Sequence, residues 1–381
     1  KRADCPHYGI IGGSTMYDII IIGTGPGGYE AALRAAELGA RVALVERREI
    51  GGTCLNRGCV PTKALLHAAE LYRKVRDGAS YGICAEGLRL DPEAMYAKKD
   101  QVVTRLREGI EGLLKRAKVD VLRGVGTILG PGRVRVQGED TAEYDCRYIL
   151  AATGAAPARP PIPGLSLAVT SDELLAALPR LPEQPVIIGG GVIGAEFATF
   201  FSDLGCRVTV LEGMDRLLPG MDRELGQGLA ATLKKRGVTV KTGAMVQRLE
   251  QTTEGICVHY FQKDKPEAAT GDCVLCAIGR IPSWEGLFAP GLNPRTEGRR
   301  LWVRENYETD IPGVYAIGDL SSPVQLAHVA TAQGRACVEK LLGVPVMPTT
   351  RFSFGRTFIK ARKRFDCQFL KLESSSITIM S

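Results

Sequence analysis

The sequence predicts an α/β fold with two nucleotide-binding units built on parallel sheets. One strand–turn–helix–strand pattern occurs twice, over residues 17–46 and again over residues 186–212, and both copies contain a glycine-rich turn. The composition agrees, because 45% of the 381 residues are hydrophobic, 24% are charged and 45 are glycine. At about 150 residues per domain, this length suggests two or three domains.

The first copy begins with an isoleucine-rich run over residues 17–22. Such a short continuous apolar run is typical of a strand that is buried on both faces of a parallel sheet. The turn GTGPGG over residues 23–28 comes next, and an alanine-rich stretch over residues 29–38, closed by Gly39, predicts a helix. A second strand over residues 41–45 leads directly to Glu46.

The residues of this turn have separable physical roles. Gly23 allows the tight turn, Gly25 lets the backbone approach a pyrophosphate, and Gly28 lets the helix pack close to the strand. The free N–H groups and the positive end of the helix hold the phosphate charge. Glu46 is placed to accept hydrogen bonds from a ribose hydroxyl.

The second copy repeats this arrangement in the same register. Its strand, turn, helix and second strand cover residues 186–188, 189–194, 195–204 and 208–211. In each copy the acidic residue, Glu46 or Glu212, stands 23 residues after the first glycine. Two α/β units that bind no phosphate are the alternative, but they leave the repeated glycines unexplained. We therefore predict two Rossmann-like dinucleotide-binding domains.

The acid of the second copy also discriminates between nicotinamide cofactors. Glu212 would repel a 2′-phosphate, and the arginine that usually accommodates this phosphate is absent, because Arg216 lies beyond the strand end. The sequence therefore favours NAD over NADP at this copy.

A pair of cysteines follows the first copy, in the segment GGTCLNRGCVPTK. On a regular helix the Cα atoms of Cys54 and Cys59 would be about 8 Å apart, beyond the limit of about 7 Å for a disulfide. A bridge needs a distorted turn, which Gly58 and Pro61 can provide. Its small loop adds little stability, which favours a bridge that opens and closes. The N-terminus of the helix predicted over residues 64–75 would lower a thiolate pKa. Two unrelated buried cysteines are the alternative.

The other cysteines carry no comparable signal. Cys273 and Cys276 have the C-x-x-C spacing of a zinc or thioredoxin site, but they lie in an apolar run with no second cysteine or histidine pair beside them. We interpret them as core residues and predict no metal site. Eleven cysteines in this chain are also too sparse for a disulfide scaffold.

The distribution of the net charge of +7 along the chain argues against a nucleic-acid partner. Residues 346–381 contain seven basic and two acidic residues and so account for +5 of it, which leaves the rest of the chain nearly neutral. No apolar run is long enough to predict a membrane helix. Residues 1–15 do not resemble a secretory signal. Met16 is a natural start, so we expect an N-terminal extension over residues 1–15 and a cytoplasmic protein.

The stretch GGTCLNRGCVPTKALL, between two dinucleotide motifs, resembles the flavoprotein disulfide reductases, the class I pyridine nucleotide-disulfide oxidoreductases. It is most similar to their dihydrolipoamide dehydrogenase branch. Glutathione and mercuric reductases share the cysteine spacing, whereas the PTKALL continuation and Glu212 point to the NAD-linked branch. The segments ATG, AIGR, YAIGD and LAHVA, at residues 152–154, 277–280, 315–319 and 326–330, also match.

The resemblance implies a role for each matching position. FAD would be bound on the first copy, by residues that also include the cysteine segment: Gly23, Gly25, Gly28, Glu46, Gly52, Thr53, Lys63, Gly126, Asp319 and Ala327. NAD would be bound on the second copy and near it, with Val246 the weakest candidate: Gly190, Gly191, Val192, Ile193, Gly194, Glu212, Val246 and Gly279. Lys63 would lie beside the flavin and pair with Glu196. Cys54, Cys59, Lys63 and Glu196 would carry the chemistry.

The resemblance also implies domain boundaries and an activity. The FAD-binding domain would comprise residues 16–156 and 282–345, with an NAD-binding domain over residues 157–281 inserted into it. A dithiol substrate would attack Cys54, and Cys59 would become a thiolate. The reaction would be oxidation of protein-bound dihydrolipoamide to lipoamide with NAD⁺ as the acceptor. The partner would be a lipoyl-bearing protein of a 2-oxoacid dehydrogenase or glycine cleavage complex.

The sequence leaves the family pattern after Gly343. The family has a C-terminal domain that builds the homodimer and supplies a His–Glu pair, but His328 is the last of the four histidines. We therefore expect that residues 346–381 form a divergent basic tail and that the homodimer is doubtful. Without the base, the dithiol step would slow by roughly 10²–10⁴-fold. The alternatives are a truncated flavoprotein with NADH diaphorase activity only, or a non-catalytic FAD- and NAD-binding remnant.

Overall fold

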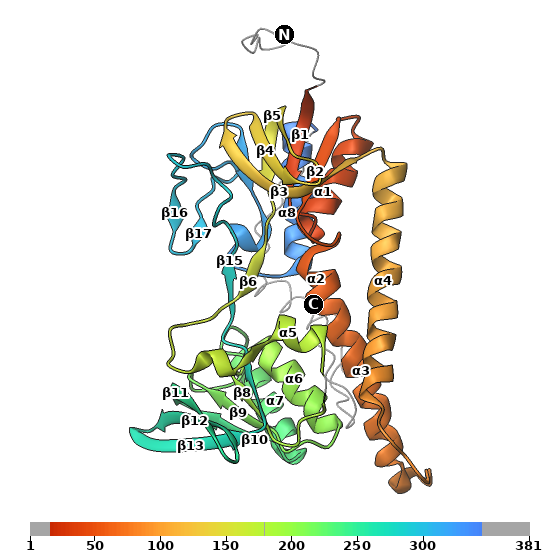
Figure 1. Cartoon of the computed structure of the whole chain (residues 1–381), viewed down its shortest axis with the longest axis vertical. Coiled ribbons are helices and arrows are strands. Elements are labelled where there is room, and N and C mark those ends of the chain that lie inside the picture. Colours follow the sequence, from red (N-terminus) through yellow and green to blue (C-terminus); the bar gives the residue numbers. More distant parts are fainter. Residues whose placement is uncertain (1–15, 179, 345–381) are drawn as a thin grey trace. The chain divides into compact units, whose positions relative to one another are not determined.

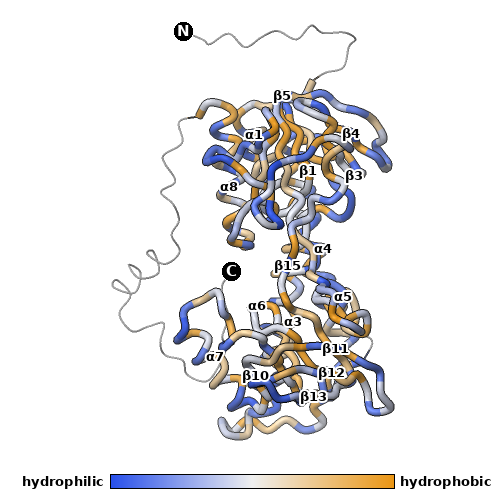
Figure 2. Tube along the Cα trace, turned by 90° about the vertical axis from the view of Figure 1, so that its left-hand side faces the viewer, coloured by the Kyte–Doolittle hydropathy of each residue, from blue (hydrophilic) through white to orange (hydrophobic). Residues whose placement is uncertain are grey.

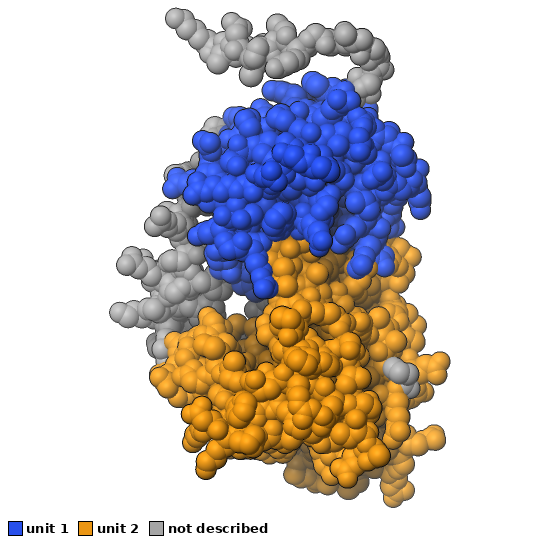
Figure 3. All heavy atoms as spheres, turned by 60° about the vertical axis from the view of Figure 1, so that its left-hand side comes forward, with its two compact units in different colours: residues 1–50, 111–154, 284–345 blue, residues 51–110, 155–283, 346–381 orange. Residues whose placement is uncertain are grey.

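The structure is a computed structural model that describes residues 16–178 and 180–344 (Figure 1). The expectations for residues 1–15 and for the tail over residues 346–381 lie outside these residues. The chain divides into two compact units. Among the described residues, unit 1 comprises residues 16–50, 111–154 and 284–344, and unit 2 comprises residues 51–110, 155–178 and 180–283 (Figure 3).

Unit 1 is built on a largely parallel sheet. Its strands are β1 (Tyr17–Ile22), β2 (Val42–Glu46), β3 (Asp120–Gly130), β4 (Arg133–Gly138), β5 (Ala142–Ala151) and β18 (Val314–Ala316). β1 pairs in parallel with β2 and β5, so that Ile20 lies beside both Ala43 and Ile149. β2 pairs in parallel with β3 and β5 with β18, while β4 joins β3 and β5 in antiparallel register.

The isoleucine run forms β1 as predicted, with β2 and β5 hydrogen-bonded along its two edges and most of its side chains buried. Ile19, Ile20 and Ile21 have no exposed surface. Figure 2 shows hydrophobic segments within each unit and hydrophilic loops at its surface. The smaller elements of unit 1 are β16 (Thr296–Glu297), β17 (Arg300–Leu301) and the 3₁₀ turn η3 (Gly318–Leu320).

Two helices of unit 1 that are far apart in sequence pack directly on each other. They are α1 (Pro26–Glu37) and α8 (Ala327–Leu341). A Cβ atom at Gly334 would lie 2.4 Å from the carbonyl oxygen of Gly27, so only glycine permits this approach. An ion pair between Arg34 Nε and Glu339 Oε1, 2.7 Å long, joins the same helices.

Unit 2 contains a fully parallel sheet in the order β10-β9-β8-β14-β7. These strands are β7 (Val169–Thr170), β8 (Pro185–Ile188), β9 (Thr209–Glu212), β10 (Thr239–Thr242) and β14 (Cys273–Cys276). A separate antiparallel sheet consists of β11 (Ala244–Thr252), β12 (Gly255–Gln262) and β13 (Lys265–Gly271), and β6 (Ala155–Pro157) pairs with β15 (Arg280–Pro282). The 3₁₀ turns are η1 (Gly78–Tyr81) and η2 (Leu165–Leu167).

The helices of unit 2 are α2 (Gly52–Arg57), α3 (Cys59–Arg76), α5 (Ser171–Ala176), α6 (Val192–Asp203) and α7 (Arg223–Lys235). The long helix α4 (Pro92–Arg116) has its first part in unit 2 and its last residues in unit 1. Leu65 and Ala69 of α3 share one apolar cluster with Phe197 and Phe201 of α6, and all four side chains are buried. This packing places residues 51–110 in the same compact unit as the second glycine motif. The family resemblance instead assigns residues 51–110 to the FAD-binding domain, and those domain boundaries stay a prediction.

Candidate active site

The two glycine turns have the same backbone geometry. Gly23 and Gly189 adopt positive φ angles of 103° and 107°, which favour glycine. A Cβ atom on Gly28 would lie 1.9 Å from the oxygen of Gly23, and a Cβ atom on Gly194 would lie 1.9 Å from the oxygen of Gly189. The first and third glycines of each motif therefore serve the fold itself.

The middle glycines are different, because they face open space. Gly25 and Gly191 precede α1 and α6 in extended conformations. A Cβ atom on either one would meet no described atom within 4 Å. The open space lies at a helix N-terminus, where free N–H groups and the helix dipole attract phosphate. α1 begins at Pro26, earlier than predicted, because proline is well suited to the first turn of a helix.

A glutamate closes each turn in the same way. Glu46 Oε2 accepts hydrogen bonds from the backbone N–H and the hydroxyl of Thr24, and Glu46 Oε1 accepts one from the N–H of Arg48. Glu212 Oε2 accepts a hydrogen bond from the N–H of Gly190 at 2.5 Å, and its Oε1 accepts one from the N–H of Met214 at 2.7 Å. Glu46 is predicted to bind a ribose hydroxyl and Glu212 to discriminate against a 2′-phosphate; in addition, each carboxylate is hydrogen-bonded to the backbone of its own turn.

The cysteine pair of unit 2 lies where one helix is interrupted. α2 ends at Arg57, Gly58 adopts φ −147° and ψ −117°, and α3 begins at Cys59. The predicted distortion is therefore located at Gly58. Both cysteines are thiols, and the thiol of Cys54 donates a hydrogen bond to the sulfur of Cys59. This break brings together two sulfurs that a continuous helix would separate.

The two sulfurs have different acidities. The hydrogen bond from Cys54, and then the positive charge of Lys63, lower the pKa of the Cys59 thiol, against burial and the charge of Glu196. The pKa of Cys54 is raised, first by its hydrogen bond to Cys59 and then by burial. The negative charge of the reduced pair therefore resides on Cys59, at the positive end of α3.

Lys63 lies one helical turn after Cys59 and forms an ion pair with Glu196 of α6. The Nζ–Oε1 distance is 2.9 Å, and the lysine side chain is 32% exposed whereas that of the glutamate is 12% exposed. This half-buried pair fixes Lys63 beside Cys59, in the pairing that the family resemblance implied.

Arg280 is a nearby residue whose contacts the sequence analysis did not predict. Its guanidinium donates to the carbonyl of Ala155 at 2.6 Å and to the hydroxyl of Thr53 at 3.5 Å, and pairs with Asp172 at 3.3 Å. Thr53 directly precedes Cys54, so Arg280 connects the cysteine segment to β6 and α5. The segment AIGR at residues 277–280, which matches the family, is the sequence signal that includes Arg280.

The remaining predicted residues fall in both units. In unit 1, Gly126 is buried on β3 against Ile22 and Val45, while Asp319 lies in η3 and Ala327 begins α8. In unit 2, Gly52 and Thr53 begin α2, Val192 and Ile193 begin α6, and Gly279 has an open Cβ direction within the described chain. Val246 lies on β11 and packs against an apolar cluster.

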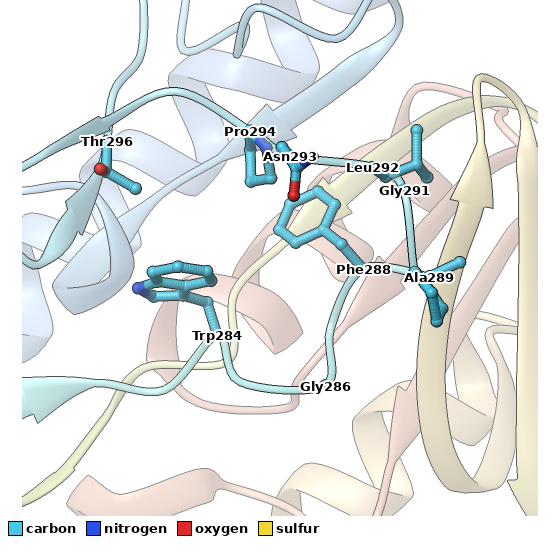
Figure 4. A pocket seen from close by; sticks show the side chains of 10 residues that line it. Trp284, Gly286, Phe288, Ala289, Gly291, Leu292, Asn293, Pro294 and Thr296 are labelled. Carbon is cyan, nitrogen blue, oxygen red and sulfur yellow. The ribbon is translucent and has the colours of Figure 1, made fainter.

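The C-x-x-C pair of β14 lies apart from the Cys54–Cys59 pair in sequence. Burial raises the pKa of both thiols, Cys273 and Cys276, to about 11 for Cys273, which agrees with the core role expected for them. A pocket of about 310 Å³ in unit 1 is lined by the loop before β16, including Trp284, Phe288 and Leu292 (Figure 4). Its lining contains none of the predicted site residues.

Two dinucleotide-type turns and a contacting thiol pair define a nucleotide-dependent disulfide oxidoreductase. The family model described as pyridine nucleotide-disulphide oxidoreductase matches residues 17–334, and the chain belongs to this family. The chain is an oxidoreductase enzyme whose cofactors are those of the family, FAD and NAD(H). Among the described residues, no helix is both long and apolar enough to cross a membrane.

The chain is similar to proteins named dihydrolipoyl dehydrogenase. One from Bacillus subtilis (strain 168) is 38% identical over an alignment of 355 residues, and the match covers 88% of this chain and 74% of the relative. Another, from Acholeplasma laidlawii, is 39% identical, and the match covers 87% of this chain and 98% of the relative. A solved structure, the Cu(II) complex of the HOCl-induced flavoprotein disulfide reductase RclA from Escherichia coli, has a TM-score of 0.74 and 30% identity, over 86% of this chain and 71% of that chain.

Proposed function

We propose that this oxidoreductase oxidises a dihydrolipoyl-type dithiol with NAD⁺ as the acceptor, through the Cys54–Cys59 pair. The observation that carries the proposal is the contacting thiol pair with its acidic member, Cys59, beside the Lys63–Glu196 ion pair. The relatives named dihydrolipoyl dehydrogenase, at 38–39% identity, support the choice of substrate.

The cysteines perform the exchange with the substrate. With the pair oxidised, a substrate thiolate attacks Cys54, the sulfur–sulfur bond to Cys59 breaks, and Cys59 leaves as a thiolate. A low pKa makes Cys59 a good leaving group, and Lys63 balances its charge. The second substrate thiol then displaces Cys54, which releases the substrate disulfide and leaves the pair as the dithiol described above.

The glycine turns fit the two cofactors. The open positions at Gly25 and Gly191 leave room for a pyrophosphate at each helix N-terminus. We assign FAD to the turn of unit 1, with Glu46, Gly126, Asp319 and Ala327, and NAD to the turn of unit 2, with Glu212. When bound, FAD would supply the two-electron link between the dithiol and NAD⁺.

The glutamate of unit 2 supports NAD over NADP. Both oxygens of Glu212 are held by backbone N–H groups, which fixes its negative charge at the end of β9, and this charge would repel a 2′-phosphate bound at the turn. Arg216, the nearest candidate for binding this phosphate, pairs with Asp215 and donates to the carbonyl of Pro219. The proposed partner is a lipoyl-bearing protein of a multienzyme complex.

The test compares two acceptors on the purified, flavin-loaded chain. We expect NADH oxidation with both a dye and lipoamide. Cys54→Ser should abolish lipoamide reduction while bound flavin and dye reduction remain, and Cys84→Ser, at an exposed cysteine of unit 2, should change neither. Full lipoamide activity in Cys54→Ser would overturn the proposed role of the pair. Dye reduction without lipoamide turnover in the unmodified chain would support the diaphorase alternative instead.

A further inference from the structure

The strands β11, β12 and β13 form an antiparallel sheet of their own (Figure 1). This sheet carries a second group of chemically active side chains, distinct from the thiol pair. Cys257 lies directly opposite Glu250 in the pairing of β12 with β11, and His259 follows two residues further along β12. Residues that are opposite each other, or two apart on one strand, point to the same face. The three side chains therefore share one face of this sheet.

The opposite face of the same strands packs into the interior of unit 2. Leu249, Val258 and Tyr260 belong to one buried apolar cluster. Cys257 is only 9% exposed, while the side chains of His259 and Glu250 are 29% and 43% exposed. The thiol thus forms the floor of a shallow site whose other two groups reach solvent, which leaves an entry path for an ion.

We propose that Glu250, Cys257 and His259 bind one divalent transition-metal cation, and that Zn²⁺ is the ion that this set of ligands fits best. One carboxylate oxygen, the cysteine sulfur and one imidazole nitrogen all lie within 4.8 Å of one another. His259 Nε2 and Glu250 Oε1 are already 2.9 Å apart. Ligand atoms at the usual Zn²⁺ distances of about 2.0–2.3 Å lie roughly 3.3–3.8 Å from one another in a tetrahedron. Small side-chain rotations are therefore sufficient.

Charge and chemistry favour the same ion. A thiolate and a carboxylate neutralise the two positive charges, and a neutral imidazole completes a set of three protein ligands with one position open to water. Binding releases the thiol proton to solvent, and no electrons are transferred. The two strands hold the ligands on paired backbone, so that little ordering is needed.

Arg248 supplies the opposing charge in this site. It faces His259 across the strand pair and forms an ion pair with Glu250 Oε2. An ion coordinated by Oε1 of the same carboxylate would experience this positive charge at close range. The proposal therefore predicts that removal of the guanidinium tightens metal binding, whereas a simple surface ion-pair cluster would show no such effect.

No metal site is predicted from the sequence at these residues, because the three ligands are not adjacent along the chain. Glu250 and Cys257 are separated by the turn between β11 and β12, and a cysteine and a histidine two residues apart match no metal motif. The register of the hairpin, with its irregularity between Val246 and Arg248, decides which side chains face each other.

The experiment titrates Zn²⁺ and Co²⁺ into the flavin-loaded chain, in a Cys54→Ser/Cys59→Ser background so that the dithiol is not a ligand. Zn²⁺ is followed by competition with a chromogenic chelator, and Co²⁺ by the difference spectrum of its sulfur charge-transfer band. We expect one ion per chain. Cys257→Ser should abolish the sulfur band, and Cys257→Ser or His259→Gln should weaken Zn²⁺ binding by more than about 10-fold. Arg248→Gln should strengthen it several-fold, and Cys84→Ser should change nothing.

Each alternative result overturns the proposal. A sulfur band that persists in Cys257→Ser would assign the ion to another cysteine. Binding that is unchanged by His259→Gln and Arg248→Gln would also exclude this site, as would no stoichiometric binding at all. Circular dichroism of each variant without metal separates lost binding from lost folding. The proposal is independent of the dithiol activity, because every measurement is made without the Cys54–Cys59 pair.

Discussion

Alanine at the middle glycine of each turn should separate the two cofactor sites. Gly25→Ala and Gly191→Ala each add one methyl group that meets no described protein atom within 4 Å. Both residues have extended backbone conformations that alanine adopts without strain, with φ −62° and −70°. As a change at the residue that caps a helix N-terminus, each substitution should cost at most about 1 kcal/mol of stability.

The methyl group should instead obstruct the pyrophosphate. A hydrogen bond to a charged group is worth about 1.5–3 kcal/mol, so the loss of one such bond weakens binding by roughly 10–150-fold. We expect Gly25→Ala to lower FAD affinity by this factor and to leave the KM for NADH of the flavin-loaded fraction unchanged. Gly191→Ala should retain full flavin content and raise the KM for NADH by the same factor.

The assay measures FAD by titration of the flavin-free chain, and NADH by dye reduction. Gly28→Ala and Gly194→Ala are the matched controls, because their methyl groups would lie 1.9 Å from a backbone oxygen and should destabilise the fold in urea. If Gly25→Ala raised the KM for NADH while Gly191→Ala lost FAD, the two assignments would be reversed. If both variants behaved like the unmodified chain, the reasoning about the open space would be refuted.

Three further changes test the charges of unit 2. Lys63→Met removes a cation that lowers the pKa of Cys59, so the reactive thiolate should form only at higher pH. The pH dependence of the alkylation rate of the reduced protein measures this, and an unshifted pH profile would contradict it. The buried carboxylate of Asp203 pairs with Arg73 Nε at 3.0 Å and with Arg236 Nη1 at 2.9 Å. Asp203→Asn should lower the free energy of unfolding in urea by about 3 kcal/mol, because it leaves both arginines without their partner. A loss no larger than that of a surface substitution would contradict this. Glu212→Ser removes a repulsive charge and should narrow the preference for NADH over NADPH about tenfold in kcat/KM, whereas an unchanged ratio would refute its role.

The strands and turns of both motifs could be predicted from the sequence because their signals are local. An apolar run, three glycines and an acid fall within one short segment, and the same backbone geometry results in both copies. A break near Gly58 was also predictable, since a bridge between Cys54 and Cys59 is incompatible with a regular helix and Gly58 or Pro61 can distort it.

Long-range contacts could not be predicted in this way. The packing of α3 on α6 depends on Leu65 and Phe197, which lie far apart in sequence, and it decides the unit to which the cysteine segment belongs. The contact of Arg280 with Thr53 likewise depends on tertiary structure. The backbone hydrogen bonds from each turn to its glutamate were missed because every residue except proline has an N–H group, so the sequence does not indicate which one the carboxylate accepts from.

The contact between α1 and α8 has a consequence for synthesis of the chain on the ribosome. Gly27 is among the first described residues to emerge, but its partner Gly334 is translated after every described residue of unit 2. The amino-terminal motif is therefore translated first and completed last. Strand β1 and helix α1 emerge before unit 2, whereas β18 and α8 of the same unit emerge after it, when unit 2 can already form its own core. A nascent chain that is stalled in between would expose the apolar side of α1, and in that state aggregation competes with folding.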